Sequence, residues 1–322
     1  MLAKEREVEV EKTNVDVKVR LEMSDINEQY ELTDTLIKQL SNSSCTIDQE
    51  WAAMYKIKRK QDKGEINAHQ ALKAIGQLDP KTQEMRVFTY IIPLYYYLRN
   101  AEYSNLSEMS TIVDLDLIEN NEDIKSSYYN RLMALLGASA FSQNKMTQAR
   151  FYCSYGINLT NIDRLIAYSY LTMGNTYLLD EYEKAKECFL KGLNHVENNP
   201  LAKIQLTRSL CFLENHWNKE NFWLNPDSNE ITDIQEIAHY HIKRNNLQQA
   251  KEILDNLEQQ PSIDNDYGIH FYLKGLAYQD KRYFYESIKH FKLSGDLFSI
   301  RLPLDQLREM GEDEQILDLL AL

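Results

Sequence analysis

The chain is poor in the two residues that most often interrupt helices. Its 322 residues include only ten glycines and six prolines. Long helices can therefore run unbroken, and strands joined by tight turns are not favoured. Hydrophobic residues make up 43% of the chain and charged residues 26%, which is ordinary for a protein with a packed core. The scarcity of glycine and proline therefore favours an all-α fold.

Cysteine and long apolar runs are also scarce. The four cysteines are widely spaced and form no C-x-x-C unit. Cys153 and Cys188 lie on apolar faces of expected helices, so we interpret them as buried thiols in a reducing cytoplasm. No apolar run approaches the ~18 residues of a membrane span, and the charged start MLAKEREVEVEK does not resemble a secretion signal. We expect a cytoplasmic chain that makes no membrane contact.

Catalytic motifs are missing. The sequence contains no phosphate-binding or dinucleotide-binding glycine pattern, no G-x-S-x-G and no H-E-x-x-H. His239 and His241 are two positions apart, so on a helix they point to different sides and cannot chelate one ion together. Without a nucleophile and base in a recognisable pattern, we predict no enzyme, no cofactor and no metal site.

Positive charge is in deficit. The formal net charge is −13 at pH 7, and an acidic chain repels the phosphates of nucleic acids. We therefore expect no specific binding of duplex DNA by these residues alone. The charge suits a basic peptide or a basic protein partner.

What the chain does contain is a repeated helix pair. The pattern is clearest in residues 168–193 and 270–296. Small residues occur where two helices would touch closely, and large apolar residues fill the gaps between them. The second copy places Leu273, Gly275 and Tyr278 on one helix and Ser287, Phe291 and Ser294 on the next. This pattern is typical of tetratricopeptide-like repeats of about 34 residues, which stack into a solenoid and bind a peptide or partner on the inner wall.

The solenoid is predicted to span residues 17–310. Residues 1–16 form a charged extension in which valines at period two favour a strand and the charges favour a helix or a frayed tail. Residues 218–230 form a loop that resembles no repeat. Residues 311–322 form a leucine-rich capping or dimerisation helix, with its apolar cluster at Ile316, Leu317, Leu320 and Leu322. This cluster either docks on the last repeat or forms a symmetric dimer contact.

Several segments resemble one family closely. Residues 161–193, the segment ENHWNKEN (214–221) and the segment IRLPL (300–304) are similar to AimR proteins, the arbitrium receptors of Bacillus phages. The similarity runs from about Val17 to Leu322. It implies a homodimeric transcription regulator in the bacterial host cell that binds a short secreted hexapeptide, usually ending in Arg-Gly-Ala, and controls the choice between lysis and lysogeny.

The resemblance also implies a binding site. The positions that match the peptide pocket of the family are Lys18, Arg164, Asn175, Leu178, Gln235, Asn265, Asp296 and Phe298. Lys18 replaces a usual arginine, which keeps the charge but loses the bidentate geometry. Ala138 and Ser142 replace two usual asparagines, which predicts a different peptide specificity. Taken singly, each polar residue can equally be a helix cap or an inter-repeat hydrogen bond.

One departure from the family is large. AimR proteins begin with a helix-turn-helix domain, and nothing in residues 1–64 resembles one. We therefore expect the peptide-binding and dimerisation part of a receptor, with DNA reached only through a head that this chain lacks. The alternative is an adaptor of the same repeat type that binds and regulates a protein partner.

Overall fold

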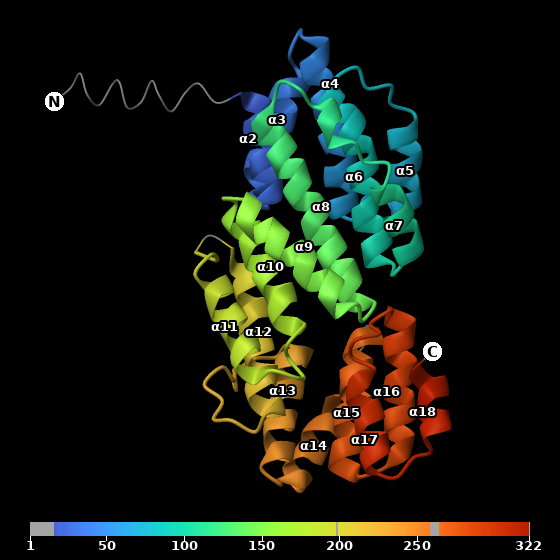
Figure 1. Cartoon of the computed structure of the whole chain (residues 1–322). Coiled ribbons are helices and arrows are strands. Elements are labelled where there is room, and N and C mark those ends of the chain that lie inside the picture. Colours follow the sequence, from blue (N-terminus) through green and yellow to red (C-terminus); the bar gives the residue numbers. More distant parts are fainter. Residues whose placement is uncertain (1–15, 198, 258–263, 322) are drawn as a thin grey trace, which may run out of the picture. The chain divides into compact units, whose positions relative to one another are not determined.

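The computed structural model describes residues 16–197, 199–257 and 264–321. Within these ranges the chain forms 17 α-helices and one short 3-10 helix, with no strand (Figure 1). The all-α prediction is confirmed. Across the same ranges, none of the helices combines the length and the apolar character that crossing a membrane requires.

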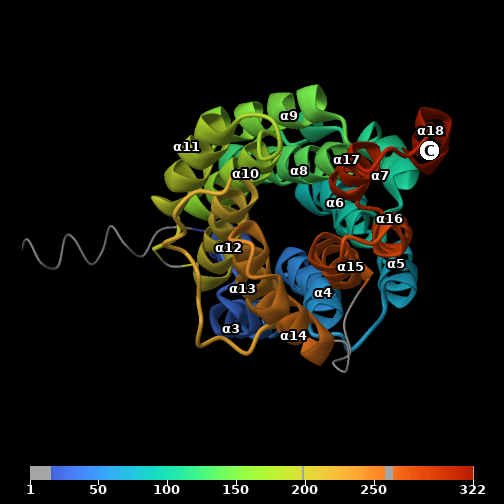
Figure 2. The same ribbon diagram turned by 90° about the horizontal axis from the view of Figure 1, so that it is seen from below.

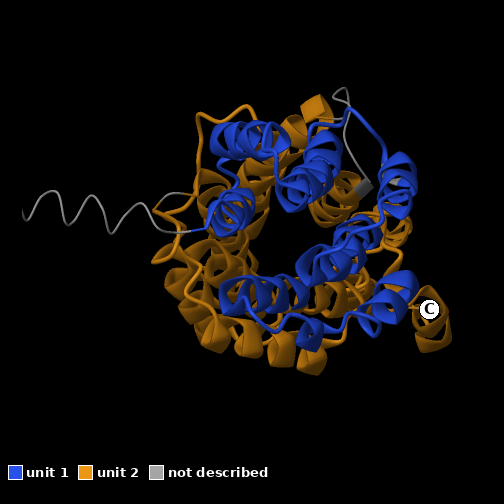
Figure 3. Ribbon diagram, turned by 90° about the horizontal axis from the view of Figure 1, so that it is seen from above, with its two compact units in different colours: residues 1–97, 104–132 blue, residues 98–103, 133–322 orange. Residues whose placement is uncertain are grey.

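The described residues divide into two compact units, shown in separate colours in Figure 3. Unit 1 comprises the described residues up to Tyr97 together with Ser104–Leu132, and unit 2 comprises Leu98–Tyr103 and the chain from Met133 onward. The elements up to residue 142 are α2 (Val17–Ile26), α3 (Tyr30–Ser41), α4 (Thr46–Asp62), α5 (Ala68–Gly76), α6 (Gln83–Arg99), α7 (Tyr103–Ser110), η1 (Leu115–Leu117) and α8 (Glu122–Ser142). The remaining helices are α9 (Met146–Leu159), α10 (Asp163–Asn175), α11 (Tyr182–Leu193), α12 (Pro200–His216), α13 (Ile231–Lys243), α14 (Leu247–Leu257), α15 (Asp264–Tyr278), α16 (Lys281–Ser294), α17 (Arg301–Glu309) and α18 (Glu314–Ala321).

The predicted domain boundaries at residues 16/17 and 310/311 stay predictions. Residues 1–15 of the charged extension lie outside the described residues. Asp16 is the N-cap of α2, and its carboxylate accepts a hydrogen bond from the backbone N–H of Lys18 at 2.9 Å. This contact satisfies one of the N–H groups that a helix start leaves open.

A run of stacked rings forms the core of unit 1. Trp51 and Tyr55 are four positions apart, so they lie on one face of α4. Their ring centroids are 6.0 Å apart. Phe88 of α6 stacks between Tyr55 and Tyr128 of α8, with centroids 4.9 Å away on each side. All four side chains are buried, so three helices share one continuous apolar seam.

Unit 1 also buries a network of charges that the sequence did not predict. The guanidinium of Arg131 in α8 bonds Glu22 of α2 at 2.8 Å and Asp25 at 2.7 Å, and Lys58 of α4 reaches Asp25 at 2.9 Å. The hydroxyl of Tyr55 also donates to Glu22. Burial acts to raise the pKa of Asp25, but the charges of Lys58 and Arg131 outweigh it and hold that pKa below its usual range. The network fixes α2 against α4 and α8.

Close helix pairs in unit 2 depend on glycine, as the repeat pattern predicts. A Cβ built on Gly275 of α15 would lie 2.5 Å from the ring of Phe284 in α16, and one on Gly174 of α10 would overlap the ring of Phe189 in α11. Ser287 of α16 donates from its hydroxyl to the carbonyl of Gly268 at 2.7 Å. These small residues let large rings fill the space between paired helices.

The first helices of successive pairs follow one another within unit 2. In Figure 2, α10, α12 and α13 are neighbours, and α9 and α11 flank them. After α12 no second helix follows: residues 218–230 are irregular, as predicted. The amide of Asn221 anchors this loop by donating to the carbonyl of Cys211 and to the side chain of Asn215, both at 2.9 Å. The loop therefore packs on α12 in place of a second helix.

The C-terminal helix packs on its own unit. Leu317 of α18 is buried in the same cluster as Leu307 of α17, and Leu320 packs against that cluster. Ile316 is 42% exposed and Leu319 is 68% exposed, while Leu322 lies outside the described residues. Leu317 therefore covers the last repeat, and an apolar strip of α18 stays at the surface.

Candidate functional site

Unit 2 contains a cavity of about 350 Å³. Its wall is built from the first helices of the pairs and from the turn that follows α16. The lining residues are Phe141, Asn175, Leu178, Leu179, Arg208, Ser209, Phe212, Thr232, Gln235, Glu236, Asn265, Asp266, Ile269, Asp296, Phe298, Ser299 and Leu302. Binding pockets for small ligands commonly have volumes of about 300–1,000 Å³ and a mainly apolar wall with a few polar groups.

The end of α10 supplies one corner of the cavity. Asn175 is the last residue of α10, directly after the glycine that packs against Phe189. Leu178 follows in the turn, and its carbonyl accepts a hydrogen bond from the indole N–H of Trp217 at 2.8 Å. This contact fixes the turn and leaves the Asn175 amide at the cavity wall, where it can meet both an N–H and a carbonyl of a ligand.

The turn after α16 supplies a carboxylate to the cavity wall. Gly295 ends α16 in the left-handed conformation, with φ 73°. The carboxylate of Asp296 then accepts hydrogen bonds from the backbone N–H of Ser299 at 3.0 Å and from its hydroxyl at 2.6 Å. Burial raises the pKa of Asp296, although the bonds from Ser299 act against that rise. Phe298 stands beside it, with its ring 4.6 Å from the ring of Phe141.

Gln235 joins two helices at the cavity wall. Its side chain is 2% exposed, and its amide donates to the backbone carbonyl of Asp266 at 2.9 Å. This bond ties α13 to the start of α15, where Asn265 also lines the cavity. The remaining N–H and the oxygen of the Gln235 amide complete a set of side-chain amides around the cavity.

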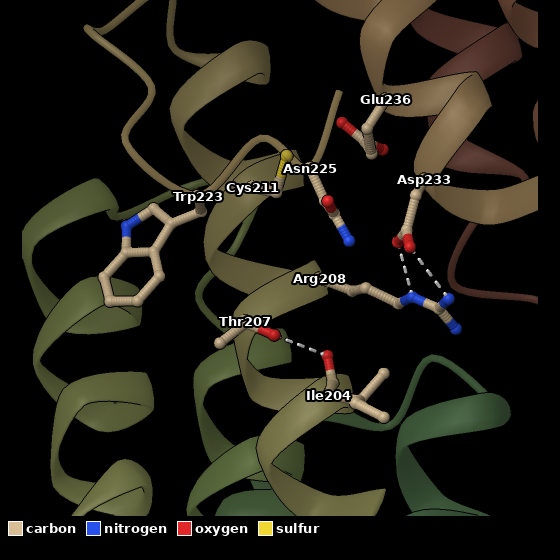
Figure 4. A pocket seen from close by; sticks show the side chains of 8 residues that line it. All are labelled: Ile204, Thr207, Arg208, Cys211, Trp223, Asn225, Asp233 and Glu236. Carbon is tan, nitrogen blue, oxygen red and sulfur yellow. Dashed lines mark hydrogen bonds and ion pairs between the residues drawn. The ribbon is translucent and has the colours of Figure 1, made fainter. Parts of the chain in front are cut away.

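An ion pair between Arg208 and Asp233 lies in the wall of a second, smaller cavity of about 100 Å³ (Figure 4). Arg208 of α12 and Glu236 of α13 line both cavities. Asp233 accepts two hydrogen bonds from the Arg208 guanidinium, at 2.7 Å from Nε and 3.2 Å from Nη2. Glu236 is buried and accepts from the amide of Asn215 at 2.8 Å.

The lining of the larger cavity is unbalanced in charge. The lining includes three carboxylates, those of Glu236, Asp266 and Asp296, and one guanidinium, that of Arg208. Rings, aliphatic side chains and amides make up most of the remainder. Such a wall suits an extended ligand with backbone-like amides, an apolar body and a positive charge. Among the described residues, no group of three or more His, Cys, Asp or Glu side chains lies as a metal site requires.

Comparison with known proteins assigns the chain to a family. A family model described as AimR transcriptional regulator-like matches residues 1–309. The chain belongs to the AimR family. Because AimR proteins are transcriptional regulators, the prediction that the chain is not an enzyme is confirmed.

Named AimR proteins are similar over most of the chain. The AimR transcriptional regulator of Bacillus phage SPbeta is 39% identical over 314 residues, which cover 96% of this chain and 81% of the relative. The AimR transcriptional regulator of Bacillus phage phi3T is 36% identical over 302 residues, which cover 94% and 79%. The SPbeta prophage-derived protein YopK of Bacillus subtilis strain 168 shows the same identity and coverage as the SPbeta protein.

Solved AimR structures share the fold. The structure titled phAimR-Ligand has a TM-score of 0.79 and 36% identity, and the similarity covers 92% of this chain and 88% of that one. The structure of selenomethionine phAimR has a TM-score of 0.84 and 36% identity, covering 95% and 80%. The predicted tetratricopeptide-like helical solenoid is thereby confirmed.

The AimR resemblance named eight pocket positions, and the structure brings six of them together. Asn175, Leu178, Gln235, Asn265, Asp296 and Phe298 all line the larger cavity. Arg164 is half-buried and does not line it. Its guanidinium lies 5.1 Å from the ring centre of Tyr168. Lys18 belongs to unit 1, where it pairs with Asp48 at 2.9 Å. The roles of all eight in binding stay predictions.

Other lining residues were missed in the AimR comparison. Arg208 and Phe212 are four positions apart on α12, so they share one face of that helix. Phe141 ends α8, and Glu236 directly follows Gln235. A usable signal is their place on the first helices of the pairs, because those helices form the cavity wall.

Proposed function

We propose that this chain is a receptor for a short peptide and that peptide binding regulates transcription, as in AimR regulators. One observation carries the proposal: six side chains chosen from the family resemblance line one cavity of about 350 Å³ within unit 2. Positions spread over more than 120 residues converge there. A regulator of this kind acts in the cytoplasm of a bacterial host, where it controls the choice between lysis and lysogeny.

The proposed roles follow from the chemistry of each side chain. Asp296 pairs with a positive group of the peptide, and the amides of Asn175, Gln235 and Asn265 bond its backbone. Leu178 and Phe298 contact its apolar side chains. Lys18 and Arg164 hold a carboxylate or backbone carbonyls of the peptide. A ligand changes such a protein only by binding one conformation more tightly than another.

Calorimetry tests the receptor function directly. The chain is titrated with a panel of hexapeptides that end in Arg-Gly-Ala, and with the same peptides in scrambled order. We expect at least one panel member to bind with a dissociation constant in the micromolar range or below, and scrambled peptides to bind at least tenfold more weakly. Absence of binding across the panel, together with capture of a folded protein partner, favours the adaptor function instead.

We further propose that the receptor is a homodimer and that α18 contributes to the contact. Ile316 and Leu319 form an exposed apolar strip on this helix, and Leu320 lies at its edge. Leu317 supports the strip from below because it is anchored in the core of unit 2. Burying such a strip on two copies is favourable, although lost rotational freedom offsets much of the gain. DNA contact is assigned to a helix-turn-helix head of the kind that AimR proteins carry.

Replacing both Ile316 and Leu319 by glutamate is expected to convert the dimer into a folded monomer. The substitution places charges in the apolar contact without disturbing the buried Leu317. Light scattering at tens of micromolar measures the mass, and circular dichroism checks the fold. The double variant Asp318→Lys/Gln315→Lys, on the same helix, serves as a charge-changing control. A wild-type monomer at that concentration contradicts the proposal.

A further inference from the structure

We propose that Arg208 receives the terminal carboxylate of the bound peptide and that Asp233 holds the guanidinium in place for it. The inference rests on the proposed receptor function. It adds an anchor that the family resemblance did not name, and it leaves the peptide backbone to Lys18 and Arg164.

The first argument is the geometry of the ion pair. Asp233 approaches the guanidinium along one edge, through Nε at 2.7 Å and Nη2 at 3.2 Å. A guanidinium has five N–H donors, so this contact leaves the edge formed by Nη1 and the second N–H of Nη2. Figure 4 shows the remaining guanidinium nitrogen, Nη1, turned away from Asp233 and joined by no dashed line to the side chains drawn there. A carboxylate fits that edge bidentately.

The second argument is that Arg208 is held rigidly. The hydroxyl of Ser228 donates to the Asp233 carboxylate at 2.7 Å, so the loop after α12 fixes the carboxylate that fixes the guanidinium. The Arg208 side chain is 28% exposed and that of Asp233 14% exposed. An arginine already held in its binding position loses little conformational freedom when a ligand arrives.

The third argument is the placement of charge. Arg208 is the one cationic side chain among the described residues that line the larger cavity. The other charged groups of the lining are carboxylates, and Glu236 is held by Asn215 and lies near the ring of His239 at 3.3 Å. A peptide carboxylate placed elsewhere on this wall would meet carboxylates with no cationic donor to bind it. The C-terminus therefore lies against α12 and α13, and the cationic group of the peptide lies toward Asp296.

Because Asp233 balances the charge of Arg208, the site offers directed hydrogen bonds more than net positive charge. A simple anion gains little there, since Glu236 and Asp266 oppose it. A peptide that satisfies Arg208 with its carboxylate and Asp296 with its cation gains both contacts at once. The site thus selects a free C-terminus in a ligand that also carries a positive charge.

The test compares one peptide in two forms. The tightest hexapeptide of the Arg-Gly-Ala panel is titrated into the protein with a free C-terminus and as the C-terminal amide. We expect the wild-type chain to prefer the free acid by about 10- to 100-fold, as charge-assisted hydrogen bonds contribute. Arg208→Gln should remove that preference, and Asp233→Asn should reduce it, while both variants still bind the amide.

Arg150→Gln is the matched control. Arg150 is likewise held by two hydrogen bonds, from Nε to the Thr176 hydroxyl at 2.9 Å and from Nη2 to its carbonyl at 2.7 Å, and it does not line the cavity. Arg150→Gln changes the net charge by the same amount as Arg208→Gln, and it should leave the preference for the free acid intact. Equal affinity for acid and amide, or a preference that survives Arg208→Gln, overturns the inference and leaves the receptor function standing. Failure of both peptide forms to bind the wild-type chain overturns both.

Discussion

Replacing Arg131 by methionine is expected to lower the free energy of unfolding by about 3–5 kcal/mol. The change removes the guanidinium that pairs with Glu22 at 2.8 Å and Asp25 at 2.7 Å, and it leaves those carboxylates buried. Asp25 keeps its ion pair with Lys58 at 2.9 Å, but Glu22 is left buried without a counter-charge. An uncompensated buried charge costs more than the apolar packing of a methionine side chain contributes. Denaturant unfolding followed by circular dichroism measures the loss.

The control for this variant is an exposed ion pair. Lys191→Met removes the partner of Glu187, whose contact of 2.7 Å lies on the surface of α11 with both side chains more than half exposed. Denaturant unfolding should show no resolvable loss for this variant, because solvent screens an exposed pair. Glu22→Gln in the Arg131→Met background should recover part of the loss. A loss below 1 kcal/mol for Arg131→Met contradicts a structural role for the network.

The same network predicts a response to acid. The pKa of Asp25 lies below its usual range in the folded chain, because Lys58 and Arg131 outweigh the effect of burial. Its contribution to stability is therefore complete above the pKa of an unfolded aspartate, about 3.9. That contribution is lost as the pH falls through the lower folded value.

The second large effect is expected at the cavity. Asp296→Ala should weaken binding of the panel hexapeptide by about 2–4 kcal/mol, or roughly 30- to 1,000-fold. The carboxylate is the proposed partner of the cationic group of the peptide, and its removal leaves that group without a counter-charge in a partly desolvated site. Calorimetry at pH 7 measures the change.

Two variants separate this binding effect from stability. Asp296 also accepts two hydrogen bonds from Ser299, so Asp296→Ala removes bonds within this turn that contribute about 1 kcal/mol each. Asp280→Ala likewise removes a side-chain bond to a backbone N–H, at the start of α16, and Asp280 lies outside the cavity lining. Asp296→Asn removes the charge, keeps one oxygen for the backbone N–H of Ser299, and places an NH₂ group that can donate to the Ser299 hydroxyl where the second oxygen accepted from it. The pocket assignment is wrong if Asp296→Asn binds like the wild type.

The pH dependence provides a further check on Asp296. Burial raises the pKa of its carboxyl above that of a free aspartate. As the pH is lowered, affinity for a cationic peptide should therefore begin to fall at a higher pH than it would if Asp296 were exposed. It should keep falling as the pH drops through the raised pKa. Asp296→Asn should remove this dependence.

The repeats were predictable because their signal is local. Gly174 and the ring of Phe189 belong to one helix pair, as do Gly275 and the ring of Phe284, so the pairs α10–α11 and α15–α16 appear in the sequence itself. The loop at 218–230 was visible as a gap in that pattern. A signal of this kind depends only on the contact between two consecutive helices, so it can be recognised without knowledge of the rest of the fold.

The charge network and part of the cavity lacked any local signal. Glu22 and Arg131 are 109 positions apart, and each resembles an ordinary surface residue in its own segment. Arg208 and Asp233 are 25 positions apart, so no local spacing indicates that they pair. The six predicted positions that line the larger cavity came from the family resemblance. Periodicity separates buried from exposed faces, but it does not pair one charge with another across helices.

The stacked rings of unit 1 have a spectroscopic consequence. The chain has three tryptophans. Trp51 is fully buried in the stack of unit 1, whereas Trp217 and Trp223 belong to unit 2, where Trp217 bonds Leu178 at the larger cavity and Trp223 lines the smaller one. Indole emission shifts with the polarity of its surroundings. A Trp51→Phe variant therefore emits only from unit 2 and reports peptide binding, while a variant that keeps Trp51 alone reports the melting of unit 1. The chain carries a natural fluorophore for each unit, and no dye is needed to follow them separately.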